Sequence, residues 1–358
     1  MSIVVTGATG FLGLHLIREL LNQHPELTLL TRADSTPALP RIQRFLEHCG
    51  ASPEEVCQLP QRLHVVAGDV TAPHLGLADN DFRRLADDID VLWHCAADIA
   101  FASPDPAVYT RNVSGTRHIL ELLTNGERQP LLCHASTIAV AGARRNGIIP
   151  EAPLDATAGF NTPYEESKYQ AEILVRHWCT RQGRNAAIFR LAGLITNTPP
   201  YPGRPQHPLE TAAQAFRDVL RTFADLVPPD GHLRLTGINP EAVINLVPVE
   251  HAAHAMAQAV ERIPLHGPRH LHIVHRHGTP AATILQALST ALDNHLVFHL
   301  DPAPPSTDAE RIVHEIFGGY LAQLTTKRHY DDTTMTGLGL ACTTGTVQNE
   351  NYLVASIA

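Results

Sequence analysis

The sequence predicts an α/β protein, a doubly wound parallel sheet that carries a smaller, mostly C-terminal lobe. Through residue 193, short apolar segments alternate with segments of helical spacing, and their apolar centres are typical of parallel strands buried on both faces. The pattern then changes to the Pro-rich stretch "TNTPPYPGRPQHP" (196–208), which is typical of a connection into another lobe.

The composition is that of a globular chain and narrows the choice of partners. With 358 residues, 44% of them hydrophobic and 18% charged, the chain can bury a large core. The net charge is -9 and no run of Lys or Arg exceeds a pair, so nucleic acid is not an expected partner. Signal-peptide and membrane-spanning patterns are absent and the six cysteines include no CxxC pair. We expect a soluble cytoplasmic protein with reduced thiols in its core.

The first strand and helix set the pattern that later segments repeat. "SIVVTGATGFLGLHLIRELL" (2–21) runs from an apolar strand through glycines into a helix with leucines at helical spacing. Further strands are predicted at 27–32, 63–69, 90–97, 130–137 and 186–193, and helices near 81–88, 106–124 and 163–182.

Beyond the Pro-rich stretch, the chain is predicted to pass between two units. A helical stretch covers 209–226, strand and helix follow at 244–260, and the strand "HLHIVH" (270–275) precedes a helical 280–292. No structure is assigned to the tail from 331, which is poor in charge and periodicity. The first predicted unit is 1–193, completed by about 240–276, and the second is 194–239 with 277–358.

Three glycines make the first unit a candidate dinucleotide-binding domain of the Rossmann type. Gly7, Gly10 and Gly13 recur every third residue between the first strand and its helix. Glycine permits a tight turn and lets the backbone approach a pyrophosphate, whose charge is stabilised at the helix N-terminus. This context favours dinucleotide binding over a purely structural turn.

The end of the second strand indicates which dinucleotide is bound. An acidic residue there suits a ribose 2′-hydroxyl, whereas an arginine suits a 2′-phosphate. The sequence has Arg32 there and no carboxylate before Asp34, so it favours NADPH over NADH, and Arg41 can join Arg32. The alternative is that Arg32 is a solvent-facing loop residue.

Two further strand ends carry candidate cofactor contacts. Asp69 can accept a bond from the adenine amino group while Val70 lines the ring, although a lone aspartate there is more often a turn former. Cys95, Ala96 and Ala97 have small side chains, which lets a flat cofactor approach the backbone. Close packing of strand and helix is the alternative.

The stretch "TPYEESKYQA" (162–171) contains the candidate proton donor. Tyr164 and Lys168 share a helix face, so the phenol and the ammonium can both reach a nicotinamide ribose. Lowering a phenol pKa from about 10 towards 7 requires roughly 4 kcal/mol, which the ammonium and the positive cofactor ring can supply.

Other side chains are predicted to support this pair. Thr137, after the fifth strand, would orient the substrate oxygen with help from Ser136, and Asn112 would hold a water that hydrates the lysine. The alternative is a solvated helix face on which the lysine pairs with Glu165 or Glu172. In either case these glutamates are expected to be solvated.

The histidine-rich segment "HLHIVHRH" (270–277) invites a metal interpretation, because alternate strand residues share a face. A zinc site also needs a closing ligand set, which cannot be placed. No metal is predicted.

Together these motifs resemble the extended short-chain dehydrogenase/reductase superfamily, and within it the thioester reductase group. That group comprises terminal reductase domains of nonribosomal peptide synthetases and carboxylic acid reductases, and the related fatty acyl-CoA reductases. The likeness covers about residues 3–260 and is carried by "VVTGATGFLG", "LLTRA", "VVAGDVTAPHLGL", "DVLWHCAADIAF", "RNVSGTRHIL", "HASTIAV", "PYEESKYQAE" and "INLVPVEHAAHAM". One departure is "FRLAGLI" (189–195), where the family usually has a proline soon after the arginine.

The resemblance and the motifs together define the candidate site. The catalytic candidates are Thr137, Tyr164, Lys168 and Asn112. The candidate NADPH-binding residues are Thr6, Gly7, Thr9, Gly10, Phe11, Leu12, Gly13, Arg32, Arg41, Asp69, Val70, Cys95, Ala96, Ala97, Tyr164, Lys168 and Leu191.

The resemblance implies hydride delivery from NADPH to an acyl thioester. Thr137 and Tyr164 would stabilise the oxyanion, Tyr164 would supply the proton, and an aldehyde would be released, which a second hydride would take to the alcohol. No adenylation or carrier domain is seen, so the thioester is expected from a separate acyl or peptidyl carrier protein or from coenzyme A. A homodimer is expected by analogy alone.

Two alternatives remain open at this point. One is an extended reductase, epimerase or dehydratase that acts on a free carbonyl or a nucleotide sugar. The other is a non-catalytic NADP-binding regulator. The second lobe does not identify the acyl group: its arginines can contact the phosphate of a carrier arm, but exposed arginines on solvated helices are favoured. They are Arg204, Arg217, Arg221 and Arg234.

Overall fold

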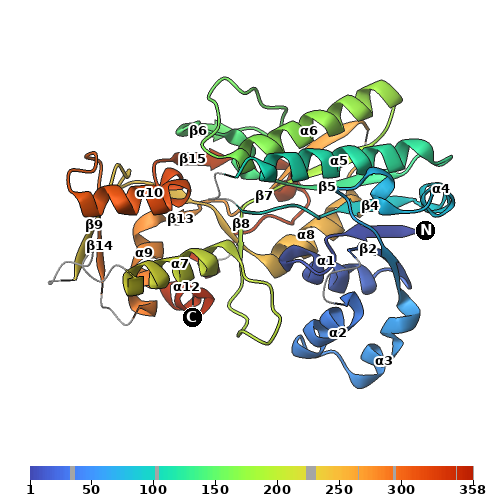
Figure 1. Ribbon diagram of the computed structural model, residues 1–358, viewed down its shortest axis with the longest axis horizontal. Coiled ribbons are helices and arrows are strands. Elements are labelled where there is room, and N and C mark those ends of the chain that lie inside the picture. Colours follow the sequence, from blue (N-terminus) through green and yellow to red (C-terminus); the bar gives the residue numbers. More distant parts are fainter. Residues whose placement is uncertain are drawn as a thin grey trace.

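A seven-stranded parallel sheet forms the centre of the molecule, in the order β12-β7-β5-β4-β1-β2-β3 (Figure 1). The computed structural model describes residues 1–32, 37–100, 105–222, 231–264, 266–292, 296–343 and 345–357. The strands of the sheet are β1 (Ile3–Thr6), β2 (Leu27–Thr31), β3 (Leu63–Ala67), β4 (Val91–His94), β5 (Leu131–Thr137), β7 (Ala186–Leu191) and β12 (Pro268–Ile273). The predicted doubly wound sheet is confirmed.

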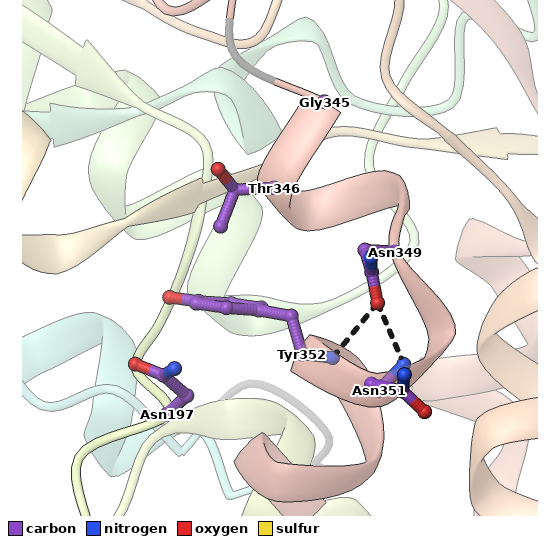
Figure 2. Close-up of a pocket in the computed structure, with 6 residues that line it drawn as sticks. All are labelled: Asn197, Gly345, Thr346, Asn349, Asn351 and Tyr352. Carbon is purple, nitrogen blue, oxygen red and sulfur yellow. Dashed lines mark hydrogen bonds between the residues drawn. The ribbon is translucent and has the colours of Figure 1, made fainter.

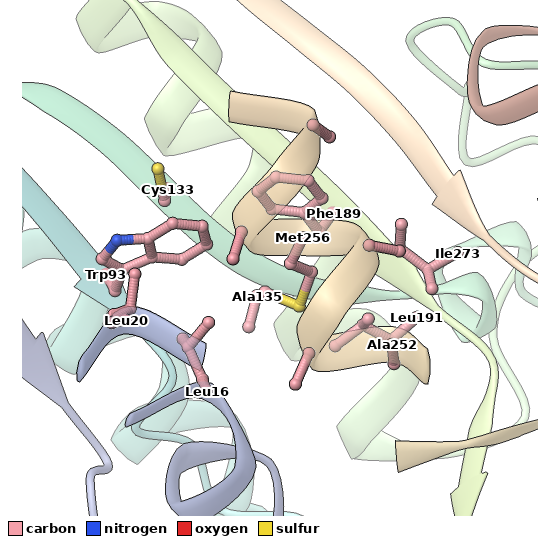
Figure 3. Close-up of a cluster of buried hydrophobic side chains, with 14 of the residues drawn as sticks. Leu16, Leu20, Trp93, Cys133, Ala135, Phe189, Leu191, Ala252, Met256 and Ile273 are labelled. Atoms are coloured by element: carbon pink, nitrogen blue, oxygen red, sulfur yellow. The ribbon is translucent and has the colours of Figure 1, made fainter. Parts of the chain in front are cut away.

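Helices cover both faces of this sheet. Successive strand residues such as Leu92 and Trp93 belong to opposite cores, as the period of a strand requires. One face packs against α1 (Phe11–Leu21), α2 (Ala38–His48) and α8 (Val249–Arg262). The other packs against α4 (Asp79–Asp88), α5 (Ala107–Asn125) and α6 (Pro163–Gln182). Figure 3 shows the first core, where Leu16 and Leu20 of α1 lie near Met256 of α8.

A separate hydrophobic core lies in the C-terminal part of the chain. It joins α7 (Pro208–Thr222), α9 (Ala281–Ala291), α10 (Asp308–Gln323) and α12 (Glu350–Ile357) to the parallel strands β9 (His232–Thr236) and β14 (Val297–Asp301). Within it, Phe216 stacks on Phe317 with ring centroids 4.5 Å apart. Met335 and Leu340 of the tail pack instead into the first core. The predicted domain boundaries stay a prediction.

The remaining elements are short or peripheral. They are α3 (Pro53–Arg62), β6 (Asn146–Ile149), β8 (Gly193–Ile195), β10 (Val243–Ile244), β11 (Leu246–Pro248), β13 (Thr279–Pro280), β15 (Lys327–Tyr330), α11 (Thr333–Gly337) and the single turns η1 (Pro73–Gly76), η2 (Ile138–Ala141) and η4 (Gly345–Gln348). The tail, left unassigned from the sequence, thus contains α11, η4 and α12.

Some sequence expectations need adjustment. The helix predicted at 209–226 begins at Pro208 and is described as far as Thr222, and the rest of it lies outside the described residues. All six cysteines are free thiols, but Cys57 is exposed on α3 rather than packed in a core. Among the described residues, no helix is long and apolar enough to cross a bilayer.

Candidate active site

The glycine turn joins β1 to α1 and forms a cradle without side chains. Gly7 has a φ of 70°, and a Cβ placed on it would lie 2.5 Å from the Ala96 nitrogen. A Cβ on Gly13 would lie 2.1 Å from the Gly7 oxygen. The N-cap residue of α1 is Gly10, which provides no side-chain cap, so the positive end of the helix is left to a ligand or solvent.

Thr6 holds the ends of β1 and β4 together beneath this turn. Its side chain is fully buried; Oγ1 lies 2.9 Å from Nδ1 of His94 and accepts a hydrogen bond from the Ala96 nitrogen at 3.2 Å. Burial raises the pKa of the neighbouring Cys95 thiol to about 12, so the thiol is neutral. The small residues after β4 therefore form an uncharged wall, and their place beside a cofactor stays a prediction.

The candidate adenine contacts are held by local hydrogen bonds. Oδ1 of Asp69 accepts from both the nitrogen and the hydroxyl of Thr71 at 2.8 Å, which makes Asp69 a turn former as well as a candidate ligand. The Val70 carbonyl accepts from Nδ1 of His118 at 2.9 Å. The adenine role of Asp69 and Val70 stays a prediction.

The two predicted 2′-phosphate arginines lie in different surroundings. Arg32 is exposed directly after β2, whereas Asp34 lies outside the described residues. Arg41 lies on α2, and its buried Nε has no hydrogen-bond partner among the described residues.

Tyr164 and Lys168 occupy the first turns of α6, at the carboxyl edge of the sheet. The side chain of Thr162 caps the helix by accepting from the Glu165 nitrogen at 3.2 Å, and Pro163 occupies the first helical position. Lys168 is buried, and its Nζ donates to the Ala135 carbonyl of β5 at 2.7 Å. The helix and β5 are thereby joined where the predicted catalytic residues meet.

Burial controls the protonation of this pair. It raises the pKa of the Tyr164 phenol to about 12, while a side-chain hydrogen bond with Thr137 acts in the opposite direction. It lowers the pKa of Lys168 to about 8, and the Glu172 carboxylate opposes that shift. The phenol is therefore protonated at neutral pH, whereas the sequence argument expected its pKa to fall towards 7.

Thr137 and Leu191 lie opposite each other where β5 and β7 end. The Thr137 hydroxyl accepts from the Ala139 nitrogen at 3.2 Å and so caps the following turn, η2, while it also meets Tyr164. The structure thus brings Thr137, Tyr164 and Lys168 together as predicted from the sequence, although their catalytic roles stay a prediction.

Asn112 braces a loop against α6. Its Nδ2 donates to the Asp98 carbonyl and to Oγ of Ser167, both at 3.0 Å, and its Oδ1 accepts from the Asp98 nitrogen at 2.7 Å. These contacts occupy the side-chain amide of Asn112. One of them is to Ser167, the residue before Lys168. The predicted water at this asparagine stays a prediction, while the bracing itself was not foreseen.

The surroundings of Ser136, Glu165 and Glu172 differ from those expected from the sequence. Ser136 donates to Glu172 at 2.6 Å inside the protein, so it is unsuited to hold substrate. Glu172 and Glu165 are 2% and 0% exposed, so the expectation that these two glutamates are solvated was wrong, whereas the neighbouring Glu166 is exposed. The reason is that α6 lies on the sheet with the C-terminal part of the chain at its first turn, where Gln323 donates to Glu165 at 3.1 Å.

Arg190 is the partner of Glu172 and was missed from the sequence. It is fully buried on β7, and its Nε and Nη2 meet the two carboxylate oxygens at 3.0 and 2.8 Å. Burial opposes the ionisation of Glu172, but Arg190 and its other contacts leave the pKa of this carboxyl below its usual value. A lone arginine inside the apolar strand "AAIFRL" was the available signal, since a buried guanidinium requires an anion.

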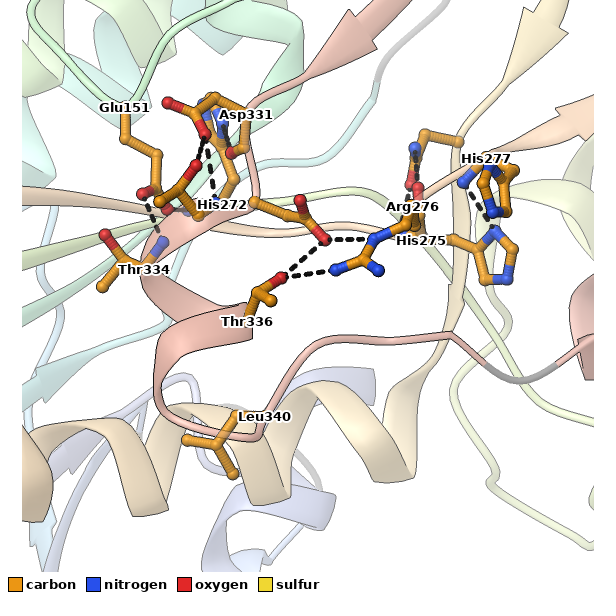
Figure 4. A network of polar contacts seen from close by, with 12 residues as sticks. Glu151, His272, His275, Arg276, His277, Asp331, Thr334, Thr336 and Leu340 are labelled. Carbon is orange, nitrogen blue, oxygen red and sulfur yellow. Dashed lines mark hydrogen bonds and ion pairs between the residues drawn. The ribbon is translucent and has the colours of Figure 1, made fainter.

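The histidine-rich segment is part of a structural network. Nδ1 of His272 lies 2.8 Å from the Asp331 carbonyl, and Glu151 accepts from the nitrogens of His272 and Thr334 (Figure 4). Burial lowers the pKa of His270 and His272 to about 4, so both rings are neutral. Among the described residues, no group of three or more metal-ligating side chains gathers. The segment therefore fastens the tail to β12.

A pocket lies where the chain leaves β8 and meets the C-terminal helix (Figure 2). Its lining residues are Asn197, Gly345, Thr346, Asn349, Asn351 and Tyr352. None of the residues predicted for catalysis lines it, so it is distinct from the site at the sheet edge.

Comparison with known proteins identifies the family. Residues 5–256 match the NAD-binding family described as male sterility protein. The chain belongs to this family. This match spans the glycine turn and the Tyr164–Lys168 pair, and it confirms the resemblance found in the sequence.

Relatives of this male sterility family member include much longer proteins. The large subunit of L-2-aminoadipate reductase from Penicillium chrysogenum is 26% identical over 338 residues, which cover 88% of this chain and 22% of that protein. A carboxylic acid reductase from Mycobacterium tuberculosis is 29% identical over 223 residues, covering 55% of this chain and 18% of that protein. The chain thus spans about a fifth of the length of these relatives.

Solved structures show the same fold as this family member. The terminal R domain from the myxalamid PKS-NRPS biosynthetic pathway aligns with 99% of this chain and 89% of its own, with a TM-score of 0.72 and 22% identity. A UDP-glucose 4-epimerase from Bifidobacterium longum covers 100% of this chain and 97% of its own, with a TM-score of 0.67 and 17% identity. The fold is that of the extended short-chain dehydrogenases/reductases.

Proposed function

We propose that the protein is an NADPH-dependent reductase that converts an acyl thioester to an aldehyde. The observation that carries the proposal is the meeting of Thr137, Tyr164 and Lys168 at the sheet edge that also holds the glycine turn. Family membership and the names of the relatives, which are reductases of carboxylic acids and of aminoadipate, support reduction as the reaction.

The chain's residues fit a bound dinucleotide. The cradle at Gly7 and Gly13 leaves no space for a Cβ, and the start of α1 has no side-chain cap. Arg32 and Arg41 would hold the 2′-phosphate, which makes NADPH the proposed cofactor. When bound, NADPH supplies the hydride.

The chemistry at the substrate is assigned to three side chains. The hydroxyls of Thr137 and Tyr164 donate hydrogen bonds to the thioester oxygen. These hydrogen bonds strengthen as negative charge develops on that oxygen. As the carbonyl carbon gains hydride, Tyr164 passes its proton to that oxygen and a hemithioacetal forms. The buried ammonium of Lys168 stabilises the resulting phenolate. The C–S bond of the hemithioacetal then breaks, the oxygen loses its proton and the thiol gains one.

Substrate presentation belongs to the same proposal. A hybrid PKS-NRPS synthetase and a linear gramicidin synthase subunit are among the relatives, and a thiolation-reductase di-domain is among the structural neighbours. The names of these proteins favour a thioester on a carrier protein, with coenzyme A as the other source. Further reduction to the alcohol, a homodimer and a cytoplasmic location stay predictions.

A substrate panel tests the proposed function. NADPH oxidation is followed with acyl-carrier protein, acyl-CoA, free ketones or aldehydes, and nucleotide sugars. Turnover with a thioester and release of aldehyde are expected. Turnover of free carbonyls or nucleotide sugars alone would instead favour the alternative reductase, epimerase or dehydratase. The likeness to solved epimerases concerns the fold and does not by itself favour that activity. Cofactor binding without turnover of any substrate would favour the regulator.

A further inference from the structure

The segment that leaves β8 for α7, residues 196–207, is here termed the strap. It begins where Thr196 donates to Glu250 at the start of α8, with 2.7 Å between the oxygens. Further on, the Arg204 nitrogen donates to the Tyr201 carbonyl at 3.0 Å across Pro202 and Gly203, and Gly203 has a φ of 85°. Proline followed by a glycine of positive φ is the signature of a type II turn. The strap thus has a defined shape.

The strap lies along α2 and ends at α1. Nη1 of Arg44 donates to the Pro202 carbonyl at 3.0 Å, and the rings of His48 and Tyr201 are 4.6 Å apart. At its end, the fully buried His207 lies 5.6 Å, ring to ring, from Phe11, the first residue of α1 after the glycine turn. The strap therefore connects the helix that follows β2 with the helix that follows the glycine turn (Figure 1).

Arg204 carries donors that the protein leaves unused. Its side chain is 9% exposed, and Nη2 lies 2.7 Å from Oε1 of Glu210. Its Nε and Nη1 are buried without a hydrogen-bond partner among the described residues, as is Nε of Arg41. Buried donors are normally paired, and an unpaired one costs stability. The expectation that Arg204 is an exposed arginine on a solvated helix was therefore wrong.

Arg41, Arg44 and His48 are three and four residues apart on α2, so they share the helix face that the strap contacts. Burial raises the pKa of the Tyr201 phenol, while the positive charges of Arg204, Arg41 and Arg44 all act to lower it. With Glu210 neutralising one of these charges, the cluster keeps a surplus of positive charge and buried donors. A phosphate monoester has two negative charges, which match the surplus positive charge, and several acceptor oxygens, which match the buried donors.

We propose that Arg204 and Arg41 form a phosphate-monoester site in which the strap closes over the adenosine ribose of the cofactor. The assignment rests on the proposed NADPH dependence. It places the 2′-phosphate here because α2 follows β2, whose end faces the adenosine ribose in this fold. Arg204 is then a specificity-determining residue that comes from the strap, about 170 residues beyond β2. The 3′-phosphate of coenzyme A has the same chemistry, and the experiment separates the two.

The test measures binding rather than turnover. Calorimetric titrations compare NADP⁺ with NAD⁺, adenosine 2′,5′-bisphosphate with 5′-AMP, and coenzyme A with dephospho-coenzyme A, for the unmodified protein and Arg204→Ala. Losing one charge-assisted contact should weaken NADP⁺ and the 2′,5′-bisphosphate by roughly tenfold to a hundredfold and leave NAD⁺ and 5′-AMP nearly unchanged. Arg204→Lys, which keeps the charge without the planar fork, should be intermediate.

Controls separate this inference from simpler explanations. Arg221→Ala removes an arginine of α7 whose side chain is 75% exposed, and it should leave every titration unchanged. Thermal unfolding shows whether Arg204→Ala remains folded; if it does not, Arg204→Lys carries the comparison.

Three outcomes would overturn the assignment: equal weakening of NADP⁺ and NAD⁺, no weakening of NADP⁺, or a loss confined to coenzyme A. These outcomes do not depend on thioester turnover. If the binding preference for the 2′-phosphate falls as expected while no thioester is reduced, the phosphate site stands and the proposed function fails. If a thioester is reduced but Arg204→Ala binds NADP⁺ as tightly as the unmodified protein, the proposed function stands and the phosphate site fails.

Discussion

Tyr164 is a phenol that carries its proton at neutral pH. Burial raises its pKa to about 12, and the buried Lys168, whose pKa is lowered to about 8, still carries a proton at neutral pH. In the proposed reaction the tyrosine would therefore start with the proton that it donates. The ammonium one turn away acquires its importance only when the phenol has lost its proton.

Tyr164→Phe should abolish turnover while the affinity for NADP⁺ stays within a few-fold, because the change removes the acid and keeps the ring. Steady-state assays with the thioester and calorimetric titration with NADP⁺ measure the two effects. Tyr169→Phe is the matched control. It lies on the same helix, and its hydroxyl donates to the Leu154 carbonyl at 3.1 Å, away from the predicted catalytic group. An active Tyr164→Phe protein would refute the acid role.

At the scale of the element, α6 connects the sheet edge that holds Tyr164 and Thr137 to the middle of the sheet. Its first turn is capped by Thr162, and two turns after Tyr164 it places Glu172 against Arg190 of β7. The buried ion pair joins helix and strand, and removing either partner would leave the other charge buried without its counter-ion.

Glu172→Ala should lower the free energy of unfolding by roughly 3–5 kcal/mol, because it leaves the Arg190 charge buried without its partner. Urea unfolding followed by circular dichroism measures the loss. Glu166→Ala, on the exposed side of the same helix, should change stability little. Similar losses in both variants would show that the buried pair has no special role.

The same element shows what the sequence could and could not predict. Strands, the glycine turn and the Tyr164–Lys168 spacing follow from local periodicity, so the sheet and the meeting of Tyr164 with Thr137 were predictable. The burial of Glu165 and Glu172 was not, because it depends on which segments lie over the helix. The Arg204 site depends likewise on a strap that packs on α2 from far along the chain.

At the scale of the whole molecule, buried histidines make stability depend on pH. Burial lowers the pKa of several imidazoles from 6.5 to about 4 or about 3. They are His15, His207, His270 and His272 at about 4, and His94 at about 3. Their folded-state pKa values lie below the unfolded value, so between pH 6.5 and about 4 the unfolded chain binds more protons than the folded protein.

The free energy of unfolding should therefore be fully retained above pH 6.5 and fall as the pH drops towards 4, by up to about 1.4 kcal/mol per pH unit for each such histidine. Urea unfolding at pH 7, 6 and 5 gives the slope. His94→Gln should reduce this slope by about one histidine's share. An unchanged slope in His94→Gln would contradict the argument.

The packing of Met335 and Leu340 beneath the large sheet also bears on how the chain folds during synthesis. β15 pairs with β6, which lies about 180 residues earlier in the chain, and the backbone of Cys342 forms an isolated β-bridge with that of His275. The hydrophobic surface of the first core that Met335 and Leu340 cover thus stays exposed until the ribosome has delivered these two residues. Nascent chains that stall before this point should be held by chaperones or proteolysed, even though the cofactor cradle was translated first.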